Sequence, residues 1–456
     1  MASLLIKGGR LISPEDQLDS ELDVLVEDGV IRGIAPQITV AADEILEAAG
    51  KVVSPGFVDL HVHLRDPGGE ASETLETGLA AAVAGGFTAV CPMPNTKPVI
   101  DRPGLVHDMI DKAQRIGLAR VLPIAAVSMG SQGQSLTDLH ALAAAGAVAF
   151  SDDGRPVKTA GLLKRALEVA QEINIPLMDH CEDPSLSASG VINEGEVSSQ
   201  LKVRGIPGAS EDVCVARDLI VAESVGARLH VCHVSTARSI ELVRLGKHRG
   251  IRVTCEATPH HFTLTDQAVL EHGTNAKVNP PLRSARDVEA IVAGLMDGTV
   301  DAIASDHAPH APELKAKPLG TDSPFGLIGL ETALGLALTQ LVHTGKISMW
   351  HLVSLMSANP ARIVNQPYGR LSVGGPADIT VFDPQLEWTY LAAEGRSKSR
   401  NSPHRLFNRQ SAINKRQSLR FCLLLTAYWL AAAARFDGGD AGLAERTFGR
   451  IVVLNG

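Results

Sequence analysis

Two histidines one residue apart, His61 and His63, close an apolar run that begins at Phe57 and is typical of a buried β-strand. Side chains alternate along a strand, so both imidazoles are expected on the same side of it. By the same count, Arg65 places a cation on that side. Two imidazoles at one strand end can bind a single metal ion, so this stretch predicts one edge of a metal site that other strand ends must complete.

Further residues of metal-ligand type follow later apolar runs. They are Asp152-Asp153-Gly154, Asp179-His180-Cys181-Glu182, Cys232-His233 and Asp306-His307. Taken one at a time, a strand-end histidine is more often a hydrogen-bonded core residue, and Asp-Asp-Gly is more often a turn. At one shared edge, however, buried imidazoles and carboxylates would be costly without a compensating charge. Imidazole with carboxylate suits zinc, and the lack of a cysteine among the obvious ligands favours a catalytic site of one or two ions.

The elements that must position these residues alternate between strand and helix. Apolar strands are expected at 57–62, 87–91, 121–127, 148–150, 175–178, 229–231, 251–256 and 300–304. Ala- and Leu-rich helices, often closed by glycine, follow most of them. Eight such units predict an α/β fold of the (β/α)₈ TIM-barrel type, whose C-terminal rim would collect the polar strand ends. An open doubly wound sheet is the alternative, although no glycine-rich nucleotide motif opens any of the helices.

Both ends of the chain are expected to pair in a small β-domain beside the barrel. Asp28-Gly29 lies between two apolar runs, which is a hairpin signal. Gly374-Gly375-Pro376 leads into another apolar run that ends at Asp383. The predicted organisation is an N-terminal part of the small domain at 1–54, the barrel at 55–365, a C-terminal part of the small domain at 366–403 and an atypical tail at 404–456.

Composition limits the class of partner and the compartment. The chain has 456 residues and a formal net charge of -9, which argues against nucleic acid or an anionic membrane as a partner. Its 6 cysteines form no C-x-x-C pair, as expected for reduced thiols. The first residues lack the pattern of a signal peptide. A cytoplasmic location is therefore predicted.

The run from Asp59 to Gly68, Asp-Leu-His-Val-His-Leu-Arg-Asp-Pro-Gly, resembles the signature of the dihydroorotases of the amidohydrolase superfamily, in their long bacterial type. Further motifs that resemble this family follow in the family's order. They are Met93-Pro94-Asn95-Thr96, Phe150-Ser151-Asp152-Asp153-Gly154, Asp179-His180-Cys181-Glu182-Asp183, His233-Val234-Ser235-Thr236, Asn279-Pro280-Pro281-Leu282-Arg283, Ser305-Asp306-His307-Ala308-Pro309-His310 and Pro324-Phe325-Gly326. The resemblance covers roughly residues 3 to 403.

The resemblance implies a centre of two zinc ions. The implied ligands are His61, His63, Asp153, His180, His233 and Asp306. The first two histidines would bind one ion with Asp306 close by, and the other two histidines would bind the second. Asp153 would bridge the ions, where many relatives have a carboxylated lysine.

The resemblance also implies a substrate pocket around the metals. The implied contacts are His63, Arg65, Asn95, Asn279, His310 and the backbone at Phe325 and Gly326. His307, His260 and His261 match family positions as well, and we predict structural roles for them.

The activity implied is that of a zinc-dependent dihydroorotase, which interconverts N-carbamoyl-L-aspartate and L-dihydroorotate in de novo pyrimidine (UMP) biosynthesis. A metal-bridging hydroxide would attack the amide, and Asp306 would carry its proton to the leaving nitrogen as general acid and base. Arg65 would offer a planar fork of donors to the substrate carboxylate. The alternatives are another cyclic amidohydrolase, a hydantoinase or allantoinase, and an inactive dihydroorotase-like scaffold for aspartate carbamoyltransferase. A homo-oligomer and an association with that carbamoyltransferase are left open.

The family pattern stops after Pro403. The chain continues with basic residues and an apolar run from Phe421 to Ala434, which is shorter than the ~20 residues needed to span a bilayer. This run could simply be a packed helix. A frame change in the gene, which we favour, or an unrelated extension would also explain the break. Pro, Gly and Lys between Pro309 and Ser323 are typical of a mobile lid.

Overall fold

Short parallel strands carry the polar residues identified above. The computed structural model describes residues 3–404 and 450–454 and places these strands in two parallel sheets. The first sheet contains β6 (Phe57–Val62), β7 (Phe87–Pro92) and β8 (Arg120–Val121). The second contains β9 (Ile124–Ala125), β10 (Ala149–Phe150), β11 (Leu177–Asp179), β14 (Leu229–Val231), β15 (Val253–Ala257) and β16 (Ala302–Ile303).

The two sheets join on both sides into a closed ring. On one side β8 and β9 belong to a single segment, in which Leu122 N donates to Val90 O of β7 at 2.9 Å. On the other side Val62 forms a parallel bridge with His307, and His63 N donates to His307 O at 2.8 Å. With β8 and β9 counted as one, eight strands close the ring. This confirms the predicted α/β barrel and not the open doubly wound sheet.

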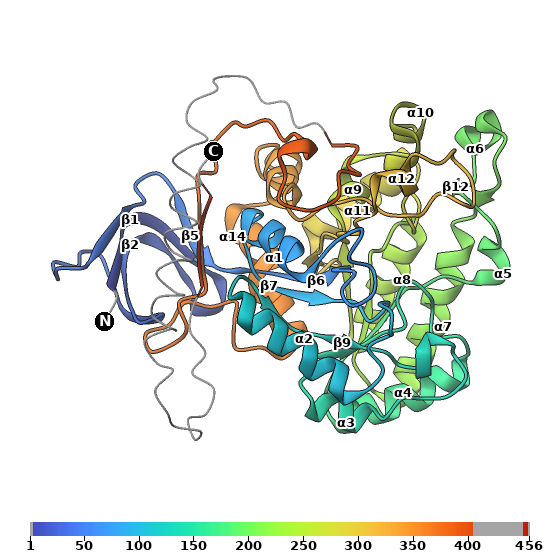
Figure 1. The fold of residues 1–456 in the computed structure, drawn as a ribbon, viewed down its shortest axis with the longest axis horizontal. Helices are drawn as coiled ribbons and strands as arrows, with labels where there is room; N and C mark the ends of the chain where they lie inside the picture. Colours follow the sequence, from blue (N-terminus) through green and yellow to red (C-terminus); the bar gives the residue numbers. More distant parts are fainter. Residues whose placement is uncertain (1–2, 405–449, 455–456) are drawn as a thin grey trace.

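Helices lie around the ring (Figure 1). The principal ones are α1 (Leu75–Ala84), α2 (Pro103–Ile116), α3 (Leu139–Ala144), α4 (Ala160–Glu172), α7 (Ala209–Val225), α8 (Ala237–His248), α11 (Ala285–Asp297), α13 (Ala333–Ala337), α14 (Met349–Val353) and α15 (Asn359–Ile363). Shorter elements in the loops are α5 (Pro184–Ser187), α6 (Glu196–Leu201), α9 (Pro259–Thr263), α10 (Ala268–His272), α12 (Pro312–Lys315) and the paired β12 (Ile192–Asn193) and β13 (Gly205–Ile206). Local sequence sets the helix ends: the Thr74 side chain accepts from Thr77 N at the start of α1, and Gly117, with φ of 71°, ends α2.

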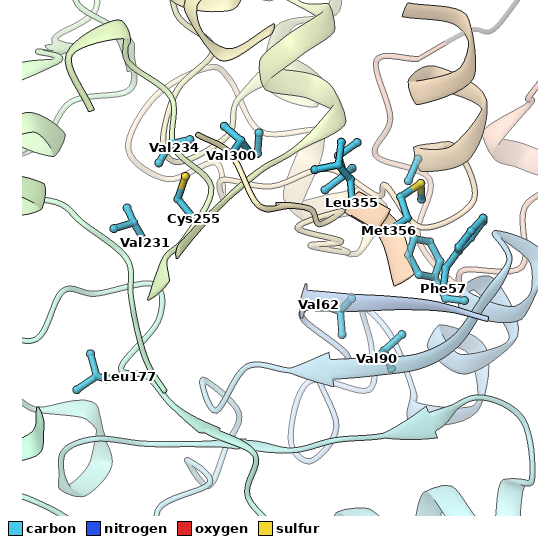
Figure 2. Close-up of a cluster of buried hydrophobic side chains, with 14 of the residues drawn as sticks. Phe57, Val62, Val90, Leu177, Val231, Val234, Cys255, Val300, Leu355 and Met356 are labelled. Atoms are coloured by element: carbon cyan, nitrogen blue, oxygen red, sulfur yellow. The ribbon is translucent and has the colours of Figure 1, made fainter. Parts of the chain in front are cut away.

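Buried apolar side chains hold the strands against the helices. The largest cluster includes Val90, Leu177 and Val231 from the strands, together with Leu355 and Met356 just beyond α14. In Figure 2, Val90 lies on a strand of the first sheet and Leu177 and Val231 lie on strands of the second. Burying one such side chain contributes about 1.5–3 kcal/mol. The cluster can therefore fix strands of only 2 to 6 residues firmly enough to carry a polar rim.

A separate mixed sheet combines segments from the two ends of the chain. Its strands are β1 (Ser3–Ser13), β2 (Leu18–Glu27), β3 (Val30–Ala35), β4 (Glu44–Glu47), β5 (Val52–Pro55), β17 (Ile379–Phe382) and β18 (Ile451–Leu454). Their order is β18-β17-β5-β1-β2-β3, with β4 paired to β1. The predicted hairpin at Asp28-Gly29 is present between antiparallel β2 and β3, and both turn residues have positive φ, 48° and 72°. Figure 1 shows this sheet beside the barrel.

The last strand, β18, comes from the segment that we assigned to an atypical tail. Ile451 pairs with Ile379 and Leu454 pairs with Phe382, in parallel. This part of the tail therefore adds a strand to the sheet, which the sequence reading did not anticipate. The packed helix considered for residues 421–434 lies outside the described residues. Within 3–404 and 450–454, no helix combines the length and the hydropathy needed to cross a bilayer.

Candidate metal centre

Six side chains from strand ends around the ring meet in one place. They are His61, His63, Asp153, His180, His233 and Asp306, which lie within β6 or just after β6, β10, β11, β14 and β16. Because parallel strands of a barrel all end at the same rim, residues far apart in the sequence converge there. The structure thus brings together every residue predicted as a metal ligand.

Asp153 occupies the middle of this group. Its Oδ1 lies 3.4 Å from His61 Nε2. The same oxygen is 3.5 Å from both His180 Nδ1 and His233 Nε2, and Oδ2 is 3.6 Å from His63 Nε2. These separations exceed the length of a hydrogen bond. Two ligand atoms that are each about 2.1 Å from a shared tetrahedral zinc ion lie roughly 3.4 Å apart, so the spacing fits ions between them.

Unpaired buried atoms point to the same conclusion. His61 Nε2 and Asp153 Oδ1, which face each other at 3.4 Å, have no hydrogen-bond partner among the described residues. His61 is fully buried and Asp153 is 2% exposed. Since buried polar atoms are nearly always satisfied, such orphans call for a missing partner. A donor set of four imidazoles and two carboxylates fits a divalent metal of the zinc type.

The two carboxylates of the group are ionised. Asp306 Oδ1 lies 3.1 Å from His63 Nε2 and 3.7 Å from His61 Nε2. Burial raises the pKa of Asp306, but the hydrogen bond from His63 and the charge of His61 outweigh burial and lower the pKa below its usual range. Burial also raises the pKa of Asp153, and the surrounding imidazoles outweigh it and hold that pKa well below the usual range. Metal ligands must be deprotonated, so both groups are in the required state.

Glu256, near the end of β15, contacts the ring nitrogen of His61 that faces away from Asp153. It was not among the site residues predicted from the sequence. Its Oε1 lies 2.8 Å from His61 Nδ1, and its Oε2 lies 3.1 Å from His230 Nε2. Burial raises the pKa of Glu256, but the hydrogen bonds from His230 and His61 outweigh burial and lower it to about 2. A carboxylate at Nδ1 leaves Nε2 of His61 facing Asp153 as a ligand atom. The available signal was a single acidic residue near the end of a strand that also holds Val253 and Cys255.

Glu182 plays a similar part beside His180. Its Oε2 lies 3.0 Å from His180 Nε2 and accepts from Asn279 Nδ2 at 2.7 Å. Asn279 Nδ2 is also 3.2 Å from His180 Nε2. Asn279, predicted as a substrate contact, is therefore placed at the metal group, but its amide is hydrogen-bonded to Glu182. Glu182 itself belonged to a recognised motif and had been given no role.

The other predicted substrate contacts lie beside His63 and on the loops that follow β6 and β16. Asn95 Oδ1 lies 3.0 Å from His63 Nδ1. Arg65 Nη2 is 3.4 Å from His310 Nε2, which lies 2.6 Å from Phe325 O. Burial and the charge of Arg65 lower the pKa of His310 to about 3, so this imidazole is neutral and donates its ring proton to that carbonyl. Gly326 follows Phe325 directly, so Arg65, His310, Phe325 and Gly326 form one connected wall of the site.

Arg65 does not reach this wall by the path predicted. Strand β6 ends at Val62, and Arg65 has φ of 59°, in the left-handed region. Alternation along a strand therefore does not extend to it, and the argument that put it on the side of His61 is wrong. The backbone turns instead, and Arg65 Nε donates to Pro309 O at 3.1 Å. This contact holds the guanidinium against the loop that carries His310.

The remaining histidines of the family motifs have mixed surroundings. His307 Nε2 is 3.3 Å from Glu73 Oε2, and its Nδ1 accepts from Gly329 N at 3.2 Å. His261 is bonded through both ring nitrogens, to the Thr258 hydroxyl and to Pro280 O. Their structural role stays a prediction that these bonds support. His260 Nε2 has no partner among the described residues.

A second buried group of possible metal ligands already contains its own cation. It consists of Asp179, Cys181, Cys214 and Asp218. The guanidinium of Arg217 lies 3.2 Å from an oxygen of Asp179 and 2.6 Å from an oxygen of Asp218. This charge compensates one carboxylate, while burial and the charge of Asp218 raise the pKa of Asp179 well above its usual range and favour its neutral form. The group therefore gives no reason to place a metal there.

Comparison with known proteins identifies the family. Residues 50–239 match the family model described as Dihydro-orotase-like. A dihydroorotase of Pelotomaculum thermopropionicum is 50% identical over 402 residues, which cover 88% of this chain and 94% of that protein. The chain belongs to the dihydroorotase family. A dihydroorotase of Solibacter usitatus is 47% identical over 400 residues, covering 88% of this chain and 93% of the relative. Membership of the dihydroorotase family confirms the predicted resemblance and makes the chain a cyclic amide hydrolase.

Solved structures agree on the fold. The L-hydantoinase (dihydropyrimidinase) of Arthrobacter aurescens superposes with a TM-score of 0.79 at 27% identity, covering 88% of this chain and 92% of the other. A dihydropyrimidinase of Brevibacillus agri gives a TM-score of 0.75 at 20% identity, over 89% of this chain and 91% of the other. The dihydroorotase family thus shares its barrel with hydantoinases, and the choice of substrate must come from residues at the rim.

Proposed function

We propose that this chain is a zinc-dependent dihydroorotase that interconverts N-carbamoyl-L-aspartate and L-dihydroorotate in de novo pyrimidine biosynthesis. The observation that carries the proposal is the place of Asp153, a carboxylate within 3.6 Å of four imidazoles. The neighbouring pair of Arg65 and His310 supports a substrate that brings its own carboxylate. A hydantoin or dihydrouracil has no such group and would leave the charge of Arg65 without an ion pair among the described residues.

In this proposal the six ligands hold two zinc ions. His61, His63 and Asp306 would hold one, His180 and His233 the other, and Asp153 would contact both. Zinc held in this way would lower the pKa of a bound water to roughly 7 and polarise the amide carbonyl. Glu256 and Glu182 would keep His61 and His180 in the orientations that binding needs.

The proton transfers fall to Asp306. Its carboxylate is ionised, and the 3.1 Å contact with His63 fixes its direction. It would take a proton on one oxygen during attack on the amide and deliver that proton to the nitrogen that leaves the ring. General acid–base groups of this kind typically contribute 10²–10⁴-fold to the rate.

The rim residues would select and orient the substrate. Arg65 and Asn95 would bind the substrate carboxylate, and His310 would join them by turning its Nε2 proton from Phe325 O to the substrate. His63 would contact substrate as well as metal. Asn279 and the backbone at Phe325 and Gly326 would contact the ring. The contacts of Asn95 with His63, of Asn279 with His180 and of His310 with Arg65 and Phe325 support this assignment.

We keep the predicted division of the chain into a barrel at 55–365 and a small β-domain built from 1–54 and 366–403, to which β18 (Ile451–Leu454) adds a strand. The pairing of β5 with β17 supports the second unit. The cytoplasmic location, a homo-oligomer and an association with aspartate carbamoyltransferase stay predictions.

Turnover by purified, zinc-loaded protein tests the function. L-dihydroorotate should be preferred over dihydrouracil by roughly 10⁴-fold or more in kcat/KM, because sites built to bind a polar substrate group reject the analogue that lacks it. A preference for dihydrouracil would favour the hydantoinase alternative. Protein that binds no zinc and turns over neither compound would favour the inactive scaffold.

A further inference from the structure

Two lysines hold the turn Ser323–Gly326, which we call the substrate turn, by its main-chain carbonyls. Lys277 Nζ donates to Ser323 O, the first carbonyl of the turn. Lys315 Nζ donates to Pro324 O at 3.1 Å and to Gly326 O at 2.8 Å. The remaining carbonyl, that of Phe325, accepts from His310 Nε2 at 2.6 Å. Every carbonyl of the turn therefore points onto a side-chain donor.

Both lysines are buried, and within residues 3–404 and 450–454 neither has an acidic partner at ion-pair distance. Lys277 is fully buried and Lys315 is 7% exposed. The lysine ion pairs among the described residues are those of Lys112, Lys164 and Lys247. Burial lowers the pKa of Lys277 to about 8, and burial together with the charge of Lys277 lowers that of Lys315 to about 7. Lysine is almost never fully buried unless it is paired, so this arrangement costs stability and calls for a function.

Further contacts from Lys277, Ala308 and Asn401 hold the substrate turn in place. The Lys277 ammonium lies 4.1 Å from the centroid of the Phe325 ring, a cation–π contact. The main-chain oxygen of Lys277 accepts from Gly326 N at 2.9 Å. Gly326 has φ of 128°, and a Cβ there would lie 2.6 Å from Ala308 Cβ. Asn401 Nδ2 also donates to Gly326 O at 3.0 Å. The turn thus has one position, set by packing and by donors.

We propose that Lys277 and Lys315 are positioning residues for substrate binding, which hold the substrate turn where its Phe325–Gly326 backbone meets the substrate ring. This inference rests on the proposed function. Since neither Nζ is placed against the metal ligands, the effect falls on substrate binding and not on the chemical step. The composition of the loop between Pro309 and Ser323 predicted a mobile lid, and Lys315 was part of that signal. In the structure Lys315 is buried and is hydrogen-bonded to the substrate turn.

Matched lysine substitutions test the inference. Lys277→Met and Lys315→Met keep most of the side-chain bulk and remove the donors and the charge. Each should raise KM for dihydroorotate at least about tenfold, as expected for lost charged hydrogen bonds, with kcat within about threefold of the parent. Zinc content should not change. The control is Lys317→Met, an exposed lysine of the same loop with the same charge change, which should behave like the parent.

Lys315→Arg is the conservative variant. It keeps the charge and the donors, so it should recover most of the KM that Lys315→Met loses. If Lys277→Met does not fold, Lys315→Met decides the question, because its ammonium reaches the turn independently from the end of α12.

Several results would overturn the inference. KM within about twofold of the parent in the methionine variants would show that the lysines position nothing. Loss of zinc, or a fall in kcat with KM unchanged, would assign them a purely structural role. A parent enzyme that does not turn over dihydroorotate would refute the proposed function, and this inference with it.

Discussion

Glu256→Gln tests the metal centre without removing a ligand. The carboxylate lies 2.8 Å from His61 Nδ1 and 3.1 Å from His230 Nε2, and it accepts from both rings. Glutamine has the same shape but presents an NH₂ group to one of the two rings. If the NH₂ group faces His61, that ring loses its acceptor. If it faces His230, His61 keeps only the weaker bond to a neutral amide oxygen, so in both orientations its hold toward Asp153 is weakened.

The structure sets the size of the expected effect. Glu256 is fully buried, so no water can replace the lost acceptor. A hydrogen bond to a charged group contributes about 1.5–3 kcal/mol. Partners behind metal-bound histidines change metal affinity by roughly 10–100-fold. We therefore expect zinc to bind about 10–100-fold more weakly in the variant, with most activity restored at saturating zinc.

Competition with a chromophoric zinc chelator measures this affinity directly. The matched control is Glu241→Gln, which removes an exposed glutamate whose partner is Arg238 at 2.8 Å. Exposed ion pairs contribute little, so the control should bind zinc like the parent. A Glu256→Gln protein whose zinc Kd stays within about threefold of the parent would refute the idea that this carboxylate orients His61.

Four further predictions follow from the proposed centre. His61→Ala should lose one zinc ion and nearly all activity, as measured by metal analysis and turnover; a metal-free protein that still hydrolyses dihydroorotate would contradict the proposal. Asp306→Asn should keep the fold and lower kcat by about 10²–10⁴-fold or more, so a variant within about tenfold of the parent would mean that the base is misassigned. Because Asp153 is already a carboxylate, activity should not depend on bicarbonate during metal loading, and a loss that bicarbonate reverses would indicate a carboxylated lysine. Arg65→Met should cost dihydroorotate on the order of 2–5 kcal/mol in kcat/KM and narrow its advantage over dihydrouracil, whereas an unchanged ratio would show that Arg65 does not read the carboxylate.

The positions of the strand ends could be predicted from the sequence, because the apolar periodicity and the turn residues mark where each element begins and ends. The run that begins at Phe57 is β6 as predicted, and the helix over Pro103–Ile116 begins at proline and ends before glycine as the local signals require. Once the barrel is inferred, the meeting of His61 with Asp306 follows from topology alone. The family resemblance then supplied the roles.

What the sequence could not supply depends on paths and partners that periodicity does not encode. Arg65 leaves the strand through a left-handed conformation, so strand alternation placed it for the wrong reason. Glu256 and Lys277 are buried charges whose partners come from distant strands and loops. Lys315 lies in a stretch whose composition is that of a surface loop, and only its carbonyl partners show that it is an anchor.

The pairing of β17 with β18 has a consequence for solubility. Strand β17 is buried along all four residues, and β18 covers the side that does not pair with β5. A chain cut before Arg450 would leave Ile379–Phe382 as an open apolar edge with free backbone donors and acceptors. Such an edge is a template on which a second chain can add its own strand. In the described part of the chain β18 is itself the outermost strand, so removing it would move the sheet edge from a largely half-buried strand to the fully buried β17 and favour sheet-to-sheet association.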